Sequence, residues 1–249
     1  MHIQSNLTLR NDLRVTTGPG GSHPLPTTLR DLFGPQATEC IEQGQALFWQ
    51  SDDASQVFEI VAGAFRTVRV LSDGRRVITG FLFPGDIVGA GSPDRYPGTV
   101  EALVPSKARR LPRRRFEAEV EHSHSLRSQL VAHLSREMSA AQEQVVLLAR
   151  KNAEERVASF LLSLVRRMGR SSQSPCIAVE LPMTRLDMAD YLGLTIETVS
   201  RVFTRLAKRG YIATAARHEV TILRPTALAL LAVDDQEDDR DDVEIAWAS

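Results

Sequence analysis

Three side chains within DYLGLTIETVSRVFTRLAKRGYI have the types and the spacing for selective hydrogen bonding. Glu197, Ser200 and Arg201 supply a carboxylate acceptor, a hydroxyl and a guanidinium with five donors, and their spacing places them on one face of a helix. Two interpretations are open. Glu197 and Arg201, four residues apart with the acid first, can form a surface ion pair worth roughly 0.2 to 0.5 kcal/mol. Alternatively, both groups can face outward and bind another molecule.

Two short helices with clear end signals carry these side chains. Thr184 lies three residues before Asp187, an arrangement that caps a helix start, and Gly193 is expected to end this first helix. Thr195 is expected to cap the second helix and Gly210 to end it. Because a tight glycine-containing turn joins two short helices, the segment predicts a helix-turn-helix.

The second helix separates into an apolar and a polar face. Its apolar face is expected to pack on the first helix, with Val199, Val202, Phe203 and Leu206 facing Met188, Ala189 and Leu192. The polar face then points outward. It carries Glu197, Ser200, Arg201, Thr204 and Lys208.

The outward face fits the edges of a base pair. In the DNA major groove, guanine O6 and N7 suit a two-pronged arginine, and cytosine N4 can donate to a carboxylate. The second helix of a helix-turn-helix is the one that enters this groove. We therefore predict that Glu197, Ser200 and Arg201 read bases and that Glu197 and Arg201 share one G·C pair.

A further set of side chains is expected to contact the DNA backbone, which positions a protein without adding sequence information. Beyond Gly210, YIATAARHEVTILR predicts two short strands around a turn, a wing. The residues at the tip of the wing, Arg217 and His218, either contact phosphate or are solvated loop residues. The backbone candidates are Thr184, Thr195, Thr204, Arg205, Lys208, Arg217 and His218.

The charge distribution agrees with a polyanionic partner. The 249-residue chain has a formal net charge of −1, but residues 151–233 contain 12 basic and 7 acidic residues. The segment DDQEDDRDDVE, from Asp234 onward, has eight acids and one arginine. A basic region can bind nucleic acid, although a plain solvated surface has the same composition.

Other classes of protein find little support in the sequence. No nucleophile elbow, phosphate-cradling glycine loop or zinc spacing occurs, so we expect no enzyme activity. No apolar run is long enough for a membrane span and the N-terminus has no export-type apolar region, so no membrane partner and a cytoplasmic location are expected. Two cysteines, Cys40 and Cys176, fit a reducing compartment.

The first half of the chain has the pattern of an all-β domain. From about Leu47 to Leu111, short runs rich in Val, Ile and Phe are divided by Gly, Asp and Pro. Alternation in FRTVRVL and the Asp73-Gly74 turn predict a hairpin. The repeated spacing predicts a sandwich or barrel.

A long helix with one apolar seam follows, starting at Leu126. Two arrangements could bury so narrow a seam. The helix could pack on the chain's own β-domain, or it could pack against the same seam of a second subunit. The regular three- and four-residue steps favour a dimer. The predicted interface residues are Leu130, Leu134, Met138, Ala141, Val145 and Leu148.

The order of these segments resembles the Crp/Fnr transcription regulators, and the residues LPMTRLDMADYLGLTIETVSR resemble the FixK-like branch. The similarity spans about Leu47 to Leu223 and includes VFEIVAGAFRTVRVLSDGRRVITGFLFPGDIVG, RKNAEERVASFLLSLVRR and the E-x-x-S-R motif. It implies a homodimeric activator that binds a palindrome with TTGA-type half-sites and contacts RNA polymerase. The exposed turn SDGRR is a candidate for the polymerase contact.

The resemblance implies an α+β fold. Its parts are a flexible arm (1–28), a cyclic-nucleotide-binding-like β-roll (jelly roll, 29–120), a dimerisation helix (121–151), a winged helix-turn-helix (152–233) and an acidic tail (234–249). The tail is expected to be disordered, with competition against DNA for the basic region as the alternative.

Departures from the family pattern bear on the signal that the chain senses. Members with an iron–sulfur cluster carry clustered cysteines in the arm and one in the roll, whereas this arm has none before Cys40 and Arg109 stands near the roll position. Members that bind cyclic AMP use a glutamate where Ala90 stands and an Arg-Ser pair that Tyr96 to Thr99 lacks. We therefore expect no cofactor.

The alternative is an effector-gated regulator with haem or another ligand in the roll. His122 and His124 form an H-x-H pair, which we interpret as a solvated connection and not as metal ligands. Cys176 is interpreted as a small inert residue, with an oxidation switch as the alternative.

Overall fold

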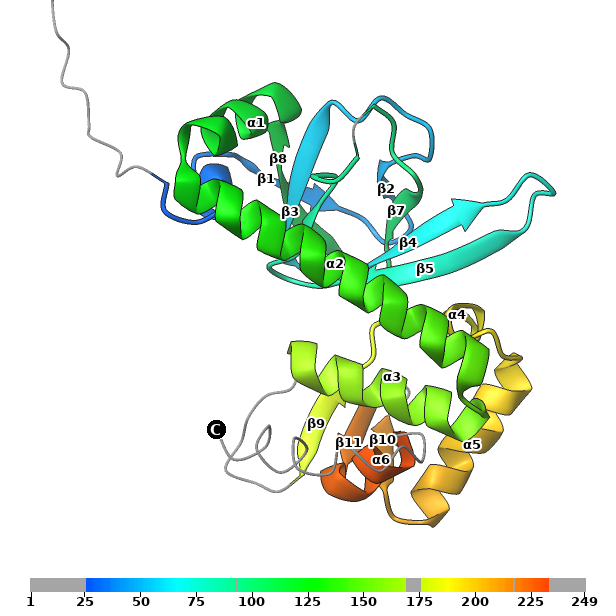
Figure 1. Cartoon of the computed structure of the whole chain (residues 1–249). Coiled ribbons are helices and arrows are strands. Elements are labelled where there is room, and N and C mark those ends of the chain that lie inside the picture. Colours follow the sequence, from blue (N-terminus) through cyan, green and yellow to red (C-terminus); the bar gives the residue numbers. More distant parts are fainter. Residues whose placement is uncertain (1–25, 93, 169–175, 217, 233–249) are drawn as a thin grey trace, which may run out of the picture.

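The computed structural model describes residues 26–92, 94–168, 176–216 and 218–232. A β-domain and a mixed C-terminal domain lie on either side of a long helix, α2 (His124–Arg150), which runs diagonally between them (Figure 1). Nearly all of the arm, Arg217 and the acidic tail, for which predictions were made, lie outside the described residues. No helix in the described ranges combines the length and the apolar character that a bilayer span needs.

Two four-stranded antiparallel sheets form the β-roll and confirm the expected sandwich. One sheet has the order β1-β8-β3-β6 and the other β2-β7-β4-β5. A short 3-10 helix, Asp31–Phe33, precedes them. The strands are β1 (Thr38–Ile41), β2 (Ala46–Phe48), β3 (Gln56–Ala62), β4 (Phe65–Val70), β5 (Arg76–Leu82), β6 (Ile87–Val88), β7 (Thr99–Ala102) and β8 (Ser106–Pro112).

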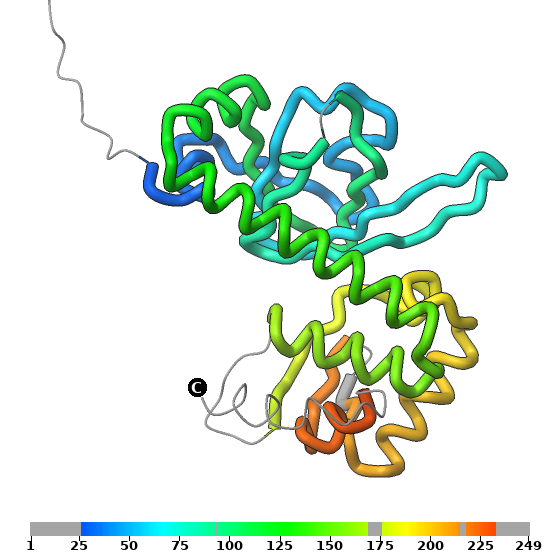
Figure 2. Tube along the Cα trace, viewed as in Figure 1, coloured from blue at the N-terminus to red at the C-terminus, as the bar shows by residue number. Residues whose placement is uncertain are grey.

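The hairpin predicted at Asp73-Gly74 joins β4 to β5, with Val70 opposite Arg76. Gly74 has a φ of 83°, a left-handed conformation that glycine adopts without steric cost. Figure 2 shows this hairpin extending away from the rest of the roll. Its turn is therefore exposed, as expected.

A helix that the sequence did not predict closes the roll. Helix α1 spans Arg113–His122, so most of it lies within the segment 29–120 that was assigned to the β-domain. Only Phe116 and Val120 of this polar stretch are buried, one turn apart, so its apolar period is too short to stand out. Ser123 then caps α2, and its hydroxyl accepts a hydrogen bond from the backbone N–H of Leu126 at 3.3 Å.

The C-terminal domain begins with α3 (Ala153–Met168) and contains a three-stranded sheet of order β10-β11-β9. The wing predicted after Gly210 is confirmed as the antiparallel pair β10–β11. The sequence interpretation missed β9 and α6, which are too short for a clear period. The remaining elements are β9 (Ile177–Glu180), α4 (Arg185–Leu192), α5 (Ile196–Lys208), β10 (Ile212–Ala216), β11 (Glu219–Ile222) and α6 (Pro225–Ala232).

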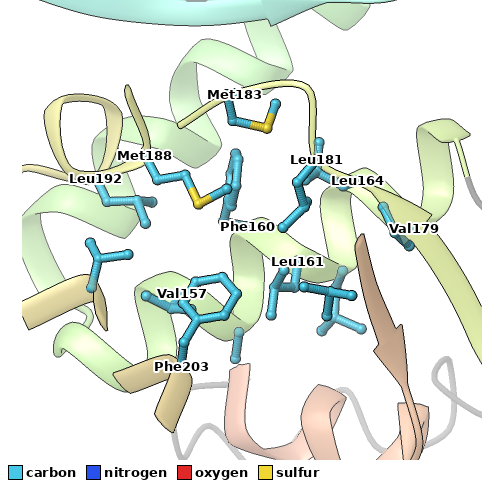
Figure 3. Close-up of a cluster of buried hydrophobic side chains, with 14 of the residues drawn as sticks. Val157, Phe160, Leu161, Leu164, Val179, Leu181, Met183, Met188, Leu192 and Phe203 are labelled. Carbon is cyan, nitrogen blue, oxygen red and sulfur yellow. The ribbon is translucent and has the colours of Figure 1, made fainter. Parts of the chain in front are cut away.

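One apolar core runs through this domain and continues into the roll. In Figure 3, Phe160, Leu161 and Leu164 of α3 lie among side chains from α4 and α5. The same buried cluster includes Phe81 and Phe83 from the β5 side of the roll. The C-terminal domain is therefore packed on the roll and does not hang from α2 alone.

Candidate nucleic-acid interface

The ends of α4 and α5 are fixed by the capping residues that the sequence predicted. The Thr184 hydroxyl accepts from the backbone N–H of Asp187 at 3.1 Å, and Asp187 Oδ2 accepts from the Thr184 N–H at 2.8 Å, a complete capping box. Gly193 ends α4 with a φ of 61°. Thr195 accepts from the Thr198 N–H at 3.2 Å, and Gly210 follows α5 with a φ of 70°.

The apolar face of α5 is buried as predicted. Val199, Val202, Phe203 and Leu206 share one cluster with Met188, Ala189 and Leu192 of α4. The Arg185 guanidinium lies over the Phe203 ring at 3.3 Å from its centroid, and its burial lowers the pKa of Arg185 to about 10. These contacts fix the rotation of α5 about its axis, so its polar face points to solvent.

That polar face carries Glu197, Ser200, Arg201, Thr204 and Lys208, all of them exposed. Among the described residues, Glu197 and Arg201 form no ion pair within 4 Å; Arg201 Nε donates instead to the Glu197 backbone oxygen at 3.4 Å. The Glu197 backbone N–H, the Thr195 hydroxyl and the charge of Arg201 hold the pKa of the Glu197 carboxyl below its ordinary value. The carboxylate is thus ionised and, like the guanidinium, faces outward.

Arg205, predicted to contact the DNA backbone, has a partner within the chain. Glu154 on α3 pairs with Arg205 at 2.6 Å and with Arg209 at 3.0 Å. The three side chains line an open pocket of about 570 Å³ that also includes Arg201. Glu154 thus offsets part of the positive charge on one flank of α5.

Ile196 is a candidate contact that the sequence interpretation missed. It is the first residue of α5, beside Glu197, and 40% of its surface is exposed. An apolar side chain at the start of a recognition helix can contact a thymine methyl group. The sequence feature that could have identified Ile196 is its position directly after the Thr195 cap.

Three other backbone candidates within the described residues, Thr184, Thr195 and His218, already form contacts inside the domain. Thr184 and Thr195 are exposed, although their hydroxyls already serve the helix caps. The exposed His218 directs Nδ1 at the Leu181 carbonyl oxygen, 3.1 Å away. The His218 ring is therefore tied to its own domain.

Helix α2 presents an apolar stripe to solvent. Val131, Met138 and Val145 are 64%, 61% and 66% exposed, and Leu134, Ala141 and Leu148 are also exposed. Together these six residues follow steps of 3, 4, 3, 4 and 3, the repeat of a coiled-coil seam. Leu130, predicted from the sequence to lie in the seam, is half-buried against the roll core, whereas Val131 beside it is exposed.

The loop of the roll that resembles a nucleotide-binding loop is held by a side chain of this chain. Arg113 donates hydrogen bonds to the carbonyl oxygens of Ala54 and Gly89 and reaches that of Ala90 at 3.5 Å. Gly89 has a φ of 89°, a left-handed conformation that glycine adopts without steric cost. Gly91 has no positive φ and lies close to Leu134.

Arg109, which stands near the roll position where the family pattern has a cluster-binding cysteine, has a structural role here. Arg109 pairs with the buried Glu59 at 3.6 Å. Burial raises the pKa of the Glu59 carboxyl, against the opposing effect of Arg109 and Arg30. Within the described ranges, no group of three or more His, Cys, Asp or Glu side chains is placed to hold a metal ion.

Taken together, the capped helix pair, its exposed polar face and the wing define a helix-turn-helix DNA-binding protein. Comparisons with known families agree. Residues 155–231 match the Crp-like helix-turn-helix domain, and residues 38–123 match the cyclic nucleotide-binding domain.

Individual relatives narrow the assignment. The transcriptional activator protein FnrA of Stutzerimonas stutzeri is 38% identical over 194 residues, covering 77% of this chain and 79% of FnrA. The nitrogen fixation regulation protein FixK of Azorhizobium caulinodans is 39% identical over 185 residues, 74% of this chain and 75% of FixK. The structure of FixK2 from Bradyrhizobium japonicum superposes with a TM-score of 0.75 at 31% identity, covering 81% of this chain and 99% of FixK2.

The chain therefore belongs to the Crp/Fnr family of transcription regulators, in its FixK-like branch. This confirms the resemblance stated from the sequence. The family is one of DNA-binding regulators and not of enzymes.

Proposed function

We propose that this regulator acts as a homodimeric activator on a palindrome with TTGA-type half-sites, with one α5 in the major groove of each half-site. The observation that carries the proposal is the outward polar face of α5. Arg201 would bind the guanine O6 and N7, and Glu197 would accept from the N4 of the paired cytosine. Ser200, exposed on the same face, would reach a neighbouring base.

The exposed stripe on α2 supports the homodimer. An apolar side chain left in water forgoes roughly 1.5 to 3 kcal/mol relative to full burial, and α2 exposes several in register. A second α2 with the same heptad spacing would cover them, and the symmetric pair would present two α5 helices to a two-fold symmetric site.

An activator also needs a contact with RNA polymerase, and we assign it to the turn of the β4–β5 hairpin. The Arg75 and Asp73 side chains are 75% and 49% exposed and pair with each other at 2.7 Å. This turn extends from the roll, away from the C-terminal domain that carries α5 (Figure 1). A polymerase subunit could therefore approach it while α5 occupies the DNA.

The proposal includes DNA binding without a cyclic nucleotide, because Ala90 replaces the ribose-binding glutamate and the loop carbonyls accept from Arg113.

The test is fluorescence anisotropy with purified, effector-free protein on a TTGA palindrome, a scrambled duplex of equal length, and a palindrome with five base pairs inserted between the half-sites. Sedimentation velocity on the same sample gives the oligomeric state.

A dimer that prefers the intact palindrome to both control duplexes would support the proposal. Equal binding to all three duplexes would refute sequence-specific dimeric recognition. Binding that appears only after an added ligand would support the effector-gated alternative.

A further inference from the structure

One side chain that belongs to neither predicted contact surface, Arg66, ties the C-terminal domain to the roll. Arg66, on β4, reaches across to α4, where its Nη1 donates to Asp187 Oδ1 at 2.5 Å. Its Nε and Nη2 donate to Glu101 Oε2 at 3.0 and 2.8 Å. One guanidinium therefore bridges a carboxylate of the roll and a carboxylate of the helix-turn-helix.

Asp187 divides its two oxygens between two tasks. Oδ2 accepts from the Thr184 N–H and hydroxyl and completes the cap of α4, while Oδ1 accepts from Arg66. The Asp187 residue is only 5% exposed. A buried carboxylate with a full set of donors is held in one place, so Arg66 fixes the position of the first turn of α4 relative to the roll.

The surrounding charges balance. Arg76 on β5 donates to both oxygens of Glu101, at 2.7 and 2.9 Å, so two guanidinium groups face two carboxylates. Burial would lower the pKa of Arg66, but its hydrogen bonds to Glu101 and Asp187 outweigh that effect and raise it. The two carboxylates of this network are buried, so a shift of α4 relative to the roll would leave Asp187 without its Arg66 donor.

The opposite end of α4 is held by other elements. Gln144 of α2 donates to the Tyr191 carbonyl oxygen at 2.8 Å, and Arg156 of α3 donates to that of Leu192 at 2.9 Å. The Tyr191 ring lies against Phe81 of β5 with centroids 5.2 Å apart. Contacts at both ends of α4 thus hold its orientation relative to the roll, and α5 packs on α4.

We propose that Arg66 is a positioning residue for DNA binding, which, through Asp187, sets the orientation of α5 relative to the roll and α2. This inference rests on the proposed binding of a dimer to two half-sites. In a dimer joined along α2, the orientation of each helix-turn-helix determines the separation of the two recognition helices. The docked arrangement leaves Glu197 and Arg201 exposed, so it is compatible with base reading.

The test compares full palindromes with single half-sites. Arg66→Gln removes the charge and the bridge, and Asp187→Asn keeps a carbonyl oxygen for the cap but turns an amide donor toward Arg66. We expect each variant to bind the full palindrome at least tenfold more weakly, with half-site affinity changed less than threefold. The double variant should be no weaker than the weaker single variant, because both changes break one contact.

Arg69→Gln is the matched control. It removes the same charge from the same strand, β4, but among the described residues the exposed Arg69 forms no salt bridge, so palindrome affinity should remain within twofold of wild type. Thermal unfolding of every variant separates positioning from stability. A purely structural contact would weaken full-site and half-site binding equally, in parallel with a lower Tm.

Wild-type affinity of Arg66→Gln for the full palindrome, or an equal loss on both DNAs, would overturn the inference. Failure of the wild-type protein to prefer a palindrome would instead overturn the proposed function.

Discussion

Helices α5 and α2 each expose one stripe of side chains, but the two stripes differ in chemistry. On α5 the stripe is polar, with Glu197, Ser200 and Arg201 presenting charged or hydroxyl groups. On α2 it is apolar and follows a heptad repeat from Val131 to Leu148. Hydrogen-bonding groups discriminate between partners, whereas apolar burial supplies affinity with little discrimination. The first stripe therefore suits DNA bases, and the second suits an identical helix.

The strongest test of this contrast places a charge in the apolar stripe. With Met138→Asp, each subunit loses roughly 1.5 to 3 kcal/mol of side-chain burial, and a buried unpaired carboxylate adds to the loss. We expect the dimer dissociation constant to rise at least a hundredfold, on the order of 3 kcal/mol. Sedimentation equilibrium measures this constant, and anisotropy should show weaker binding to the full palindrome.

Val146→Asp is the control, because Val146 is 53% exposed on the same helix but falls outside the heptad positions. It should leave the dimer intact. If Met138→Asp also remained a dimer, the α2 stripe would not be the interface.

The second prediction concerns Arg201, the main hydrogen-bond donor of the polar stripe. Arg201→Ala should cost about 1 to 3 kcal/mol per half-site and relax the preference at the guanine of the half-site. Lys208→Ala, which removes a charge from the same face, should weaken binding to all sequences similarly and lower the salt slope by about one unit per subunit. A panel of single-base variants of the site, measured at several salt concentrations, distinguishes these outcomes. Unchanged selectivity of Arg201→Ala would rule out base reading by this side chain.

The features predicted correctly from the sequence are local ones. Helix caps at Thr184 and Thr195 and the turn at Gly74 depend on residues a few positions apart, and their signals lie within one short segment. Helix α1 was missed because only Phe116 and Val120 mark its buried face. The packing of Leu130 against the roll core was not predicted, because apolar periodicity shows which residues share a face but not which neighbour covers each one.

Contacts between residues that lie far apart in the chain could not be predicted from the sequence. Arg66 and Asp187 lie 121 residues apart, and nothing in either segment indicates that they meet. The pairing of Arg205 with Glu154 was not predicted, because a partner on another helix leaves no local signal. Arg201, by contrast, was correctly placed on the exposed face because the amphipathic pattern of α5 determines which side is buried.

The third prediction concerns the flank of α5 where charge is already paired. Glu154→Gln keeps the shape of the side chain but releases Arg205 and Arg209 from their carboxylate partner. Both cations then become available to phosphate, so binding to scrambled DNA should strengthen and its salt slope should steepen by about one to two units per subunit. Glu155→Gln, on the same turn of α3, is the control because Glu155 bonds to Asn152 and not to α5. An unchanged salt slope in Glu154→Gln would show that the two arginines lie out of reach of DNA.

The smallest expected effect is the pH dependence contributed by Glu197. Its own backbone N–H, the Thr195 hydroxyl and Arg201 all favour the ionised carboxylate, so its pKa lies below the ordinary value in the folded protein. A group of this kind stabilises the fold fully above its unfolded pKa of about 4.3, and the contribution disappears as pH falls through the lower folded pKa. The urea midpoint of wild type should therefore be slightly higher than that of Glu197→Gln at pH 7 and pH 5.5, and the difference should shrink toward pH 3.5.

Ser200→Ala is the control because it removes no titrating group, so its difference in urea midpoint from wild type should not vary with the ionisation of Glu197. A Glu197→Gln difference that stayed constant down to pH 3.5 would mean that the α5 cap does not favour the ionised carboxylate, and the electrostatic contrast between the α5 and α2 stripes would then depend on Arg201 alone.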